Sequence, residues 1–128
     1  MSVLIDRQME ALSDRFPGAS AQALPSGTRL VSVPTILLPP GWSAHATGIR
    51  FLIPTGYPFA ALDCFWADDA LRLSSGNVPQ NAAPRNPIPE TNQTGLWFSW
   101  HLASPWNANR DTLSSWMNVI ADRLRRPQ

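Results

Sequence analysis

Hydrophobic residues recur at helical spacing near both ends of the chain. Close to the first end, four apolar residues fall at i, i+4, i+7 and i+11, which places them on one helical face: Ile5, Met9, Leu12 and Phe16. The pair Pro17-Gly18 is expected to end this helix. A second apolar face over residues 113–124 predicts a helix near the other end, with Asn109 or Asp111 as its N-cap.

Between the two predicted helices, four segments are rich in branched and apolar residues. This composition favours strands over residues 28–38, 48–53, 61–66 and 95–102. Pro34 lies inside the first of them, so we expect that strand to be interrupted, bulged or at a sheet edge. The order of elements predicts an α+β fold with an antiparallel meander. A length of 128 residues indicates one domain, residues 1–128.

Residues 74–94 break the hydrophobic pattern. This stretch holds four prolines, four asparagines and almost no apolar side chains. A structureless segment of this length inside a compact domain is usually functional or disordered. Because prolines stiffen the chain, we expect a shaped Pro/Asn-rich loop within the domain.

The composition narrows the class of partner. Charged residues make up 15% of the chain and the net charge is +1, which argues against nucleic acid, because that partner requires a basic patch. No apolar run is long enough to cross a membrane and the first residues lack a signal pattern, so we expect a cytoplasmic protein with no membrane partner. All ten basic residues are arginine, and three of them fall near the end of the last helix, where positive charge suits the helix dipole.

The segment containing Ser99 and His101 is the strongest candidate for chemistry. If it is extended, Phe98, Trp100 and Leu102 share a core face, and Ser99 and His101 lie together on the outer face. Residues two apart on a strand are about 6.6 Å apart along it, longer than a hydrogen bond of roughly 2.7–3 Å. One interpretation is a serine activated by a histidine base. The other is a surface serine beside a histidine that caps the core or bonds to the loop of residues 74–94. No carboxylate can be assigned as a third member.

Cys64 is the one cysteine, which excludes a disulfide framework and a zinc site built on thiolates. It lies in the third predicted strand, where an apolar setting predicts a buried thiol with a raised pKa. The alternative is a nucleophilic cysteine. His45 has no other metal ligand at a suitable spacing, so we expect no metal site.

Four stretches of sequence carry a resemblance to a known fold. In order, they read ILLPPGW, GIRFLIPTGYPFAALDCFWADDALRL, GLWFSWHLASPW and RDTLSSWMNVIADRL. Together they resemble the ubiquitin-conjugating (UBC) enzyme fold, from about Arg7 to Leu124, and most of all its prokaryotic family E. Residues 56–59 look like the segment of that fold that leads into its third strand. Trp106 looks like the tryptophan that precedes its second helix.

The resemblance implies a role as an acyl carrier. A ThiF-type activating enzyme uses ATP to adenylate a ubiquitin-like protein, and the conjugating enzyme accepts the acyl group and passes it to a target. A JAB-type protease would belong to the same pathway, and the chain itself would need no cofactor. The chain lacks the His-Pro-Asn segment of eukaryotic members and any cysteine after Phe65. Ser99 and His101 match a Ser-x-His step of family E, which implies an oxyester on Ser99 with His101 as the base.

Three interpretations therefore stay open at the level of sequence. The first is a conjugating enzyme whose acceptor is Ser99 or, less simply, Cys64, with main-chain N–H groups or asparagines of residues 74–94 as oxyanion donors. The second is a non-catalytic scaffold that binds the ubiquitin-like protein or the activating enzyme. The third is a small tryptophan-rich binding domain. The absence of lysine reflects either codon usage or protection of an activated acyl group from the protein's own amines.

Overall fold

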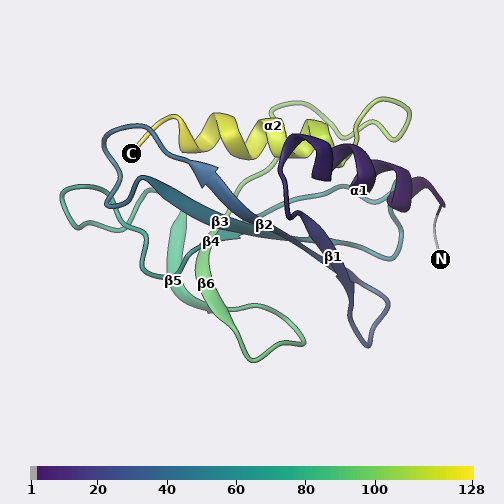
Figure 1. The fold of residues 1–128 in the computed structure, drawn as a ribbon, viewed down its shortest axis with the longest axis horizontal. Coiled ribbons are helices and arrows are strands. Elements are labelled where there is room, and N and C mark those ends of the chain that lie inside the picture. Colours follow the sequence, from purple (N-terminus) through teal and green to yellow (C-terminus); the bar gives the residue numbers. More distant parts are fainter. Residues whose placement is uncertain (1–2) are drawn as a thin grey trace.

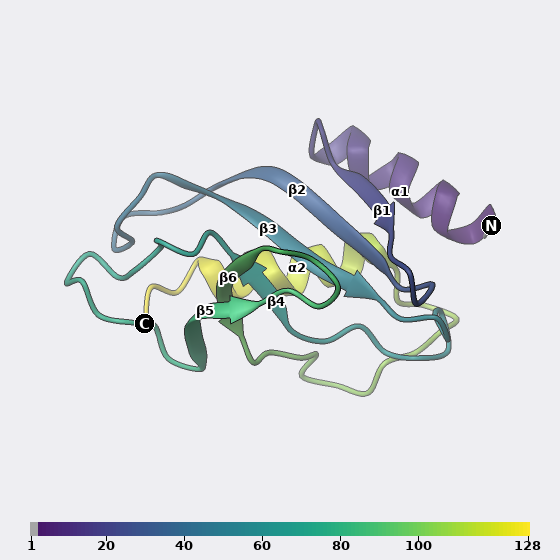
Figure 2. The same cartoon turned by 90° about the horizontal axis from the view of Figure 1, so that it is seen from below.

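The computed structural model describes residues 3–128. Two helices and six strands follow one another along the chain: α1 (Val3–Arg15), β1 (Ser20–Ala23), β2 (Arg29–Leu37), β3 (Ala46–Ile53), β4 (Phe65–Ala67), β5 (Ala82–Pro87), β6 (Thr94–Phe98) and α2 (Leu113–Leu124). The strands form one antiparallel sheet in the order β1-β2-β3-β4-β6-β5. Both helices lie along one side of the sheet (Figure 1). Figure 2 shows α1 beside β1 and α2 behind β3 and β4. The predicted α+β class is confirmed.

The main core lies between the helices and the sheet. On α2, the predicted apolar face is buried: Leu113, Trp116, Met117, Ile120 and Leu124. On α1, Ile5 and Leu12 are buried and Met9 and Phe16 pack against the same core. β3 alternates strictly between buried and half-buried residues, as expected for a strand with one face on the core. Hydrophobic periodicity therefore predicted both helices, and the apolar composition of residues 28–38 and 48–53 predicted β2 and β3.

The opposite face of the sheet carries a smaller apolar cluster. Trp66 of β4 and Ile88, just after β5, are buried in it together with Leu24 and Leu30. Leu52 and Trp97 pack against this cluster. Both faces of the central sheet are therefore covered in part by apolar side chains.

Pro34 lies where the ladder between β2 and β3 changes register. The shift falls between Val33 and Ile36, so the bulge expected from this proline is confirmed. β1 was not predicted, because its four residues are small or polar and all exposed, and they show no alternation. It forms by pairing with β2 rather than by burying a side chain of its own.

The third predicted strand, residues 61–66, is mostly wrong. β4 begins only at Phe65, and the residue before it, Cys64, has a positive φ of 58°, which is outside the extended region. The main chain turns into the ladder at this position. Cys64 is therefore not in the middle of a strand, contrary to the prediction.

Residues 74–94 are not a loop throughout, because β5 lies inside this stretch. The ladder between β5 and β6 changes register between Ala83 and Asn86, and Arg85 has a φ of 52°. β5 is an edge strand that contains Pro84 and Pro87, a position where missing N–H groups cost little. The prolines led to the wrong prediction here, since an edge strand tolerates them.

Thr112 is the N-cap of α2, so the predicted caps Asn109 and Asp111 are both wrong. The Thr112 hydroxyl accepts from the N–H of Ser115 at 3.1 Å, and the Ser115 hydroxyl accepts from the N–H of Thr112 at 2.8 Å. This is a capping box. Asp111 instead accepts from the N–H of Asn107 at 2.8 Å, so its carboxylate closes the preceding turn.

We expect Thr112→Ala to lower the free energy of unfolding by about 1 kcal/mol, because the N–H of Ser115 loses its acceptor. Thr112→Ser keeps the hydroxyl and should remain close to wild type. Urea unfolding followed by circular dichroism measures both variants. Equal stability of the alanine and serine variants would contradict the capping role.

Candidate functional site

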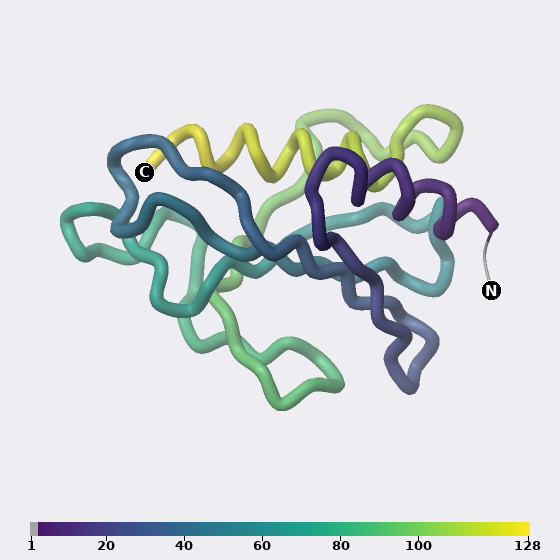
Figure 3. Tube along the Cα trace, viewed as in Figure 1, coloured from purple at the N-terminus to yellow at the C-terminus, as the bar shows by residue number. Residues whose placement is uncertain are grey.

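Ser99 lies where the chain leaves the sheet. β6 ends at Phe98, which pairs with Phe65 of β4 and Ala82 of β5. The N–H of Ser99 donates to the main-chain oxygen of Asn81 at 2.8 Å, and the Ser99 side chain is exposed. From here the chain crosses from β6 toward α2 (Figure 3). Ser99 is thus held at the end of a ladder with its hydroxyl open to solvent.

One cavity brings Ser99 and His101 together. Its volume is about 400 Å³, and Asn81, Asp122 and Arg126 also line it. A second cavity of about 470 Å³ also includes His101, and residues 101–103 line both cavities. The structure therefore places the two predicted site residues in one cavity, and His101 also lines a second one.

The predicted division of side chains is confirmed, although the predicted strand end at residue 102 is wrong. Phe98, Trp100 and Leu102 contact the core, and Ser99 and His101 are exposed. Within residues 3–128, neither the Ser99 hydroxyl nor the His101 ring takes part in a hydrogen bond. A change of side-chain rotamer or a bridging water would be needed to join them.

Two carboxylates share cavities with His101, and the sequence analysis assigned neither. Asp122 of α2 lines the cavity that contains Ser99, and Asp63 lines the neighbouring one. Asp122 also forms an ion pair with Arg125, one turn further along the helix. The spacing of Asp122 from His101 along the chain gave no signal of this proximity, which arises only when α2 packs on the sheet.

Cys64 lies close to the same segment but in an unfavourable electrostatic setting. Its N–H donates to the main-chain oxygen of Trp100 at 2.7 Å. Burial raises the pKa of the Cys64 thiol, and the charge of Asp63 raises it further. Its side chain is only half-buried, so the prediction of a core residue is wrong in degree. The raised pKa nevertheless disfavours the thiolate form that a nucleophile requires.

The segment 56–59 and Trp106, the two motifs that resemble the conjugating-enzyme fold, come together in space. The Trp106 indole N–H donates to the main-chain oxygen of Pro58 at 2.7 Å. The rings of Trp106 and Tyr57 lie 5.9 Å apart between centroids. Two motifs almost fifty residues apart therefore form one contact beside the cavity that His101 shares with Trp106.

The tryptophans do not form an exposed platform. Three are buried, Trp42, Trp66 and Trp116, and the other three are half-buried. This arrangement argues against a binding domain based on exposed tryptophans. Over residues 3–128, no cluster of three or more histidine, cysteine or acidic side chains is placed to hold a metal ion. In the same range, no helix has the length and apolar character to cross a membrane.

The order of elements, the antiparallel sheet with a helix at each end and the contact of Trp106 define an α+β fold of the ubiquitin-conjugating-enzyme type. A family model described as prokaryotic E2 family E matches residues 19–127, and the chain belongs to this family. A search of curated proteins and a search of solved structures gave no match. Family membership supports a conjugating role in general, together with an activating enzyme and a ubiquitin-like protein as the kinds of partner.

Tyr57 links this region to both helices. Its hydroxyl donates to the side-chain oxygen of Gln8, which also accepts from the N–H of Leu113 at 3.0 Å. Burial raises the pKa of Tyr57 from 10.0 to about 12, and the hydrogen bond to Gln8 opposes this shift. The protonated phenol is thus favoured in the folded protein.

We expect the tyrosinate absorbance of the folded protein to titrate near pH 12, and that of the denatured protein near pH 10. Because the folded pKa is the higher one, the stability linked to Tyr57 is complete below pH 10 and is lost as the pH rises toward 12. The chain has one tyrosine and no lysine, so few other groups titrate there. Tyr57→Phe should abolish the absorbance change. A folded-state midpoint near pH 10 would contradict the burial argument.

Proposed function

We propose that this protein accepts a ubiquitin-like protein from a ThiF-type activating enzyme as an oxyester on Ser99 and passes it to a target. The observation that carries the proposal is the exposure of Ser99 and His101 in one cavity, at the end of the central sheet of a family E chain. ATP is consumed by the activating enzyme, and this chain contributes the acceptor and the base. A JAB-type protease would act later in the same pathway.

The transfer can be written with its atoms balanced. The Ser99 hydroxyl oxygen attacks the activated carbonyl carbon of the ubiquitin-like protein and forms the ester bond. The bond from that carbon to its leaving group on the activating enzyme breaks, and His101 takes the hydroxyl proton. His101 passes this proton to the leaving group. An amine of the target then attacks the same carbon, the ester bond breaks, and His101 carries the proton lost by the amine to the Ser99 oxygen.

Asn81 is the proposed source of oxyanion stabilisation. Of the four asparagines in residues 74–94, it alone lines the cavity of Ser99. The Ser99 N–H already donates to the Asn81 main-chain oxygen, so this N–H is not free to stabilise the oxyanion. The side-chain amide of Asn81 has no hydrogen-bond partner among the described residues and can turn toward the cavity.

A second candidate function is a non-catalytic scaffold that binds the same partners. The observation that favours it is the missing hydrogen bond between Ser99 and His101 in the described residues. It predicts binding of the ubiquitin-like protein or the activating enzyme without any covalent adduct. Incubation with both partners separates the two functions.

We expect incubation with the activating enzyme, its ubiquitin-like partner and ATP to give an adduct that resists thiol reductants and is cleaved by mild alkali, as an oxyester is. Ser99→Ala should abolish the adduct, and His101→Ala should slow its formation about 10²–10⁴-fold. Cys64→Ala should leave it unchanged. Ser104→Ala is the matched control, because Ser104 is an exposed serine in the neighbouring cavity. Intact-protein mass spectrometry measures all four, and an adduct that persists in Ser99→Ala would refute the proposal.

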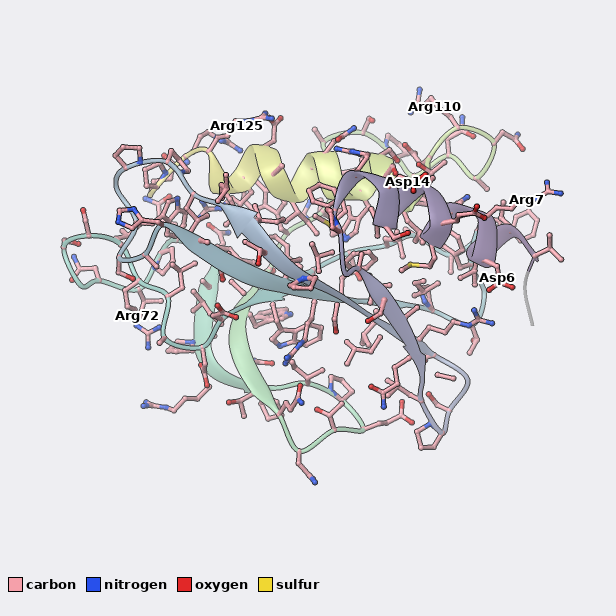
Figure 4. The ribbon with its side chains drawn as sticks, viewed as in Figure 1. Asp6, Arg7, Asp14, Arg72, Arg110 and Arg125 are labelled. Carbon is pink, nitrogen blue, oxygen red and sulfur yellow. The ribbon has the colours of Figure 1, made fainter. Side chains whose placement is uncertain are left out.

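We also expect Arg126→Lys to make the protein modify itself. Arg126 lines the cavity of Ser99, so a lysine amine there would attack the ester and leave an alkali-stable amide on residue 126. Arg110→Lys is the control, because Arg110 lies at the other end of α2 (Figure 4). Peptide mapping should find the amide in Arg126→Lys and not in Arg110→Lys or in Arg126→Lys with Ser99→Ala. No self-modification in Arg126→Lys would contradict the idea that the absence of lysine protects the ester.

A further inference from the structure

Arg123 of α2 is a buried cation that pairs with no aspartate or glutamate within residues 3–128. Its side chain is 1% exposed, and neither of the two ion pairs found within residues 3–128 includes it. Burial lowers the pKa of its guanidinium, and the charge of Arg126 lowers it further. The position was predicted to be an ordinary cation near a helix end, so its burial needs a separate explanation.

Main-chain oxygens and aromatic rings satisfy this buried guanidinium. It donates to the main-chain oxygens of Arg126 at 2.8 Å, Gln80 at 3.0 Å and Gln128 at 2.8 Å. Three rings lie within 6 Å of it, at 5.9, 5.1 and 5.3 Å to the ring centroids of Trp42, Phe98 and Trp100. Such contacts offset the loss of water around the charge. Without the guanidinium, these three main-chain oxygens would lose their donor, so Arg123 ties residues 80, 126 and 128 to α2.

The groups that Arg123 holds lie on both sides of Ser99. Phe98 and Trp100, whose rings contact the guanidinium, are the residues immediately before and after it. Gln80 immediately precedes Asn81, whose main-chain oxygen accepts the Ser99 N–H. The rings on both sides of Ser99 and the residue before Asn81 thus contact one guanidinium.

The strand ladder ends just before Ser99. Beyond it, two main-chain hydrogen bonds hold the segment, from the Ser99 N–H to Asn81 and from the Cys64 N–H to Trp100. The pairing of β6 with both of its neighbours stops at Phe98, and Ser99 is the first residue beyond it. The direction of its hydroxyl depends on the contacts that follow the ladder. We propose that Arg123 is a positioning residue that holds the Ser99 segment, through Gln80 and Trp100, in the orientation required for acyl transfer. This inference rests on the proposed function of Ser99. It gives Arg123 no contact with the reacting atoms.

Arg123→Lys tests the proposal, because it keeps the charge but removes the planar fork, so that one ammonium cannot reach all three oxygens in the same way. With the complete protein, its activating enzyme, the ubiquitin-like partner and ATP, we expect kcat for adduct formation to fall about 100-fold and KM for the loaded activating enzyme to stay unchanged. A role confined to stability would lower the melting temperature and leave kcat per folded molecule intact. That result would overturn the proposal.

Arg72→Lys is the matched control. Arg72 also donates to two main-chain oxygens, those of Asp69 at 2.8 Å and Leu71 at 2.7 Å, and Figure 4 shows it at the edge of the molecule in the loop that follows β4. We expect its kcat to equal that of wild type. A fall in kcat as large as that in Arg123→Lys would show that the effect is not specific to the Ser99 segment, and would also overturn the proposal.

Trp100→Leu is a second test if Arg123→Lys does not fold. It removes the ring next to Ser99 that contacts the guanidinium, and it keeps the three hydrogen bonds of Arg123 to main-chain oxygens. We expect kcat to fall about tenfold with KM unchanged, and a wild-type kcat would overturn the proposal. Ser99→Ala separates a failure of the proposed function from a failure of the role of Arg123. An adduct that persists there defeats the proposed function, whereas loss of the adduct there with normal kcat in Arg123→Lys defeats only the role of Arg123.

Discussion

The whole sheet depends on β4, a strand of three residues that joins its two halves. β4 pairs with β3 on one side and with β6 on the other, and all three of its residues are buried. The ring of Phe65 stacks on that of Phe98 at 4.6 Å and 7° between planes. A Cβ on Gly95 would lie 2.9 Å from the main-chain oxygen of Ala67, so only glycine permits this approach. A slip of one residue would turn Phe98 outward and Ser99 into the core, which makes this pairing the condition for an exposed acceptor.

The parts of the fold that the sequence predicted are those encoded by local periodicity. Each of α1, α2 and β3 repeats its buried positions several times within one element. Such a pattern can be recognised from the sequence of that element alone. β1 and β5 form because a neighbouring strand offers hydrogen-bonding groups, and their own side chains are small, polar or proline. The cap at Thr112 was missed because the competing carboxylate, Asp111, is occupied by a turn that only the folded loop defines.

The candidate site also combines residues that the local sequence predicts with residues that only the packing of distant elements brings together. Ser99 and His101 are two residues apart, so the sequence could pair them, and their exposure together agrees with that pairing. Asn81, Asp122 and Arg123 come from other elements, and their approach depends on how β5 and α2 pack against β6. Arg123 was the least predictable, because an arginine near a helix end is normally solvated, and its burial requires rings and main-chain oxygens contributed by four separate segments.

The prolines of β5 have a consequence for the behaviour of the protein in a crowded solution. An open sheet edge is a template for the strands of other molecules, and the edge formed by β5 lies beside the strand that leads to Ser99. Pro84 and Pro87 remove two donors from it, and the register shift between Ala83 and Asn86 bends what remains. A strand from another molecule therefore finds few hydrogen-bonding groups on β5. This edge resists the edge-to-edge pairing that begins aggregation, and the nearby cavity stays accessible to a folded partner.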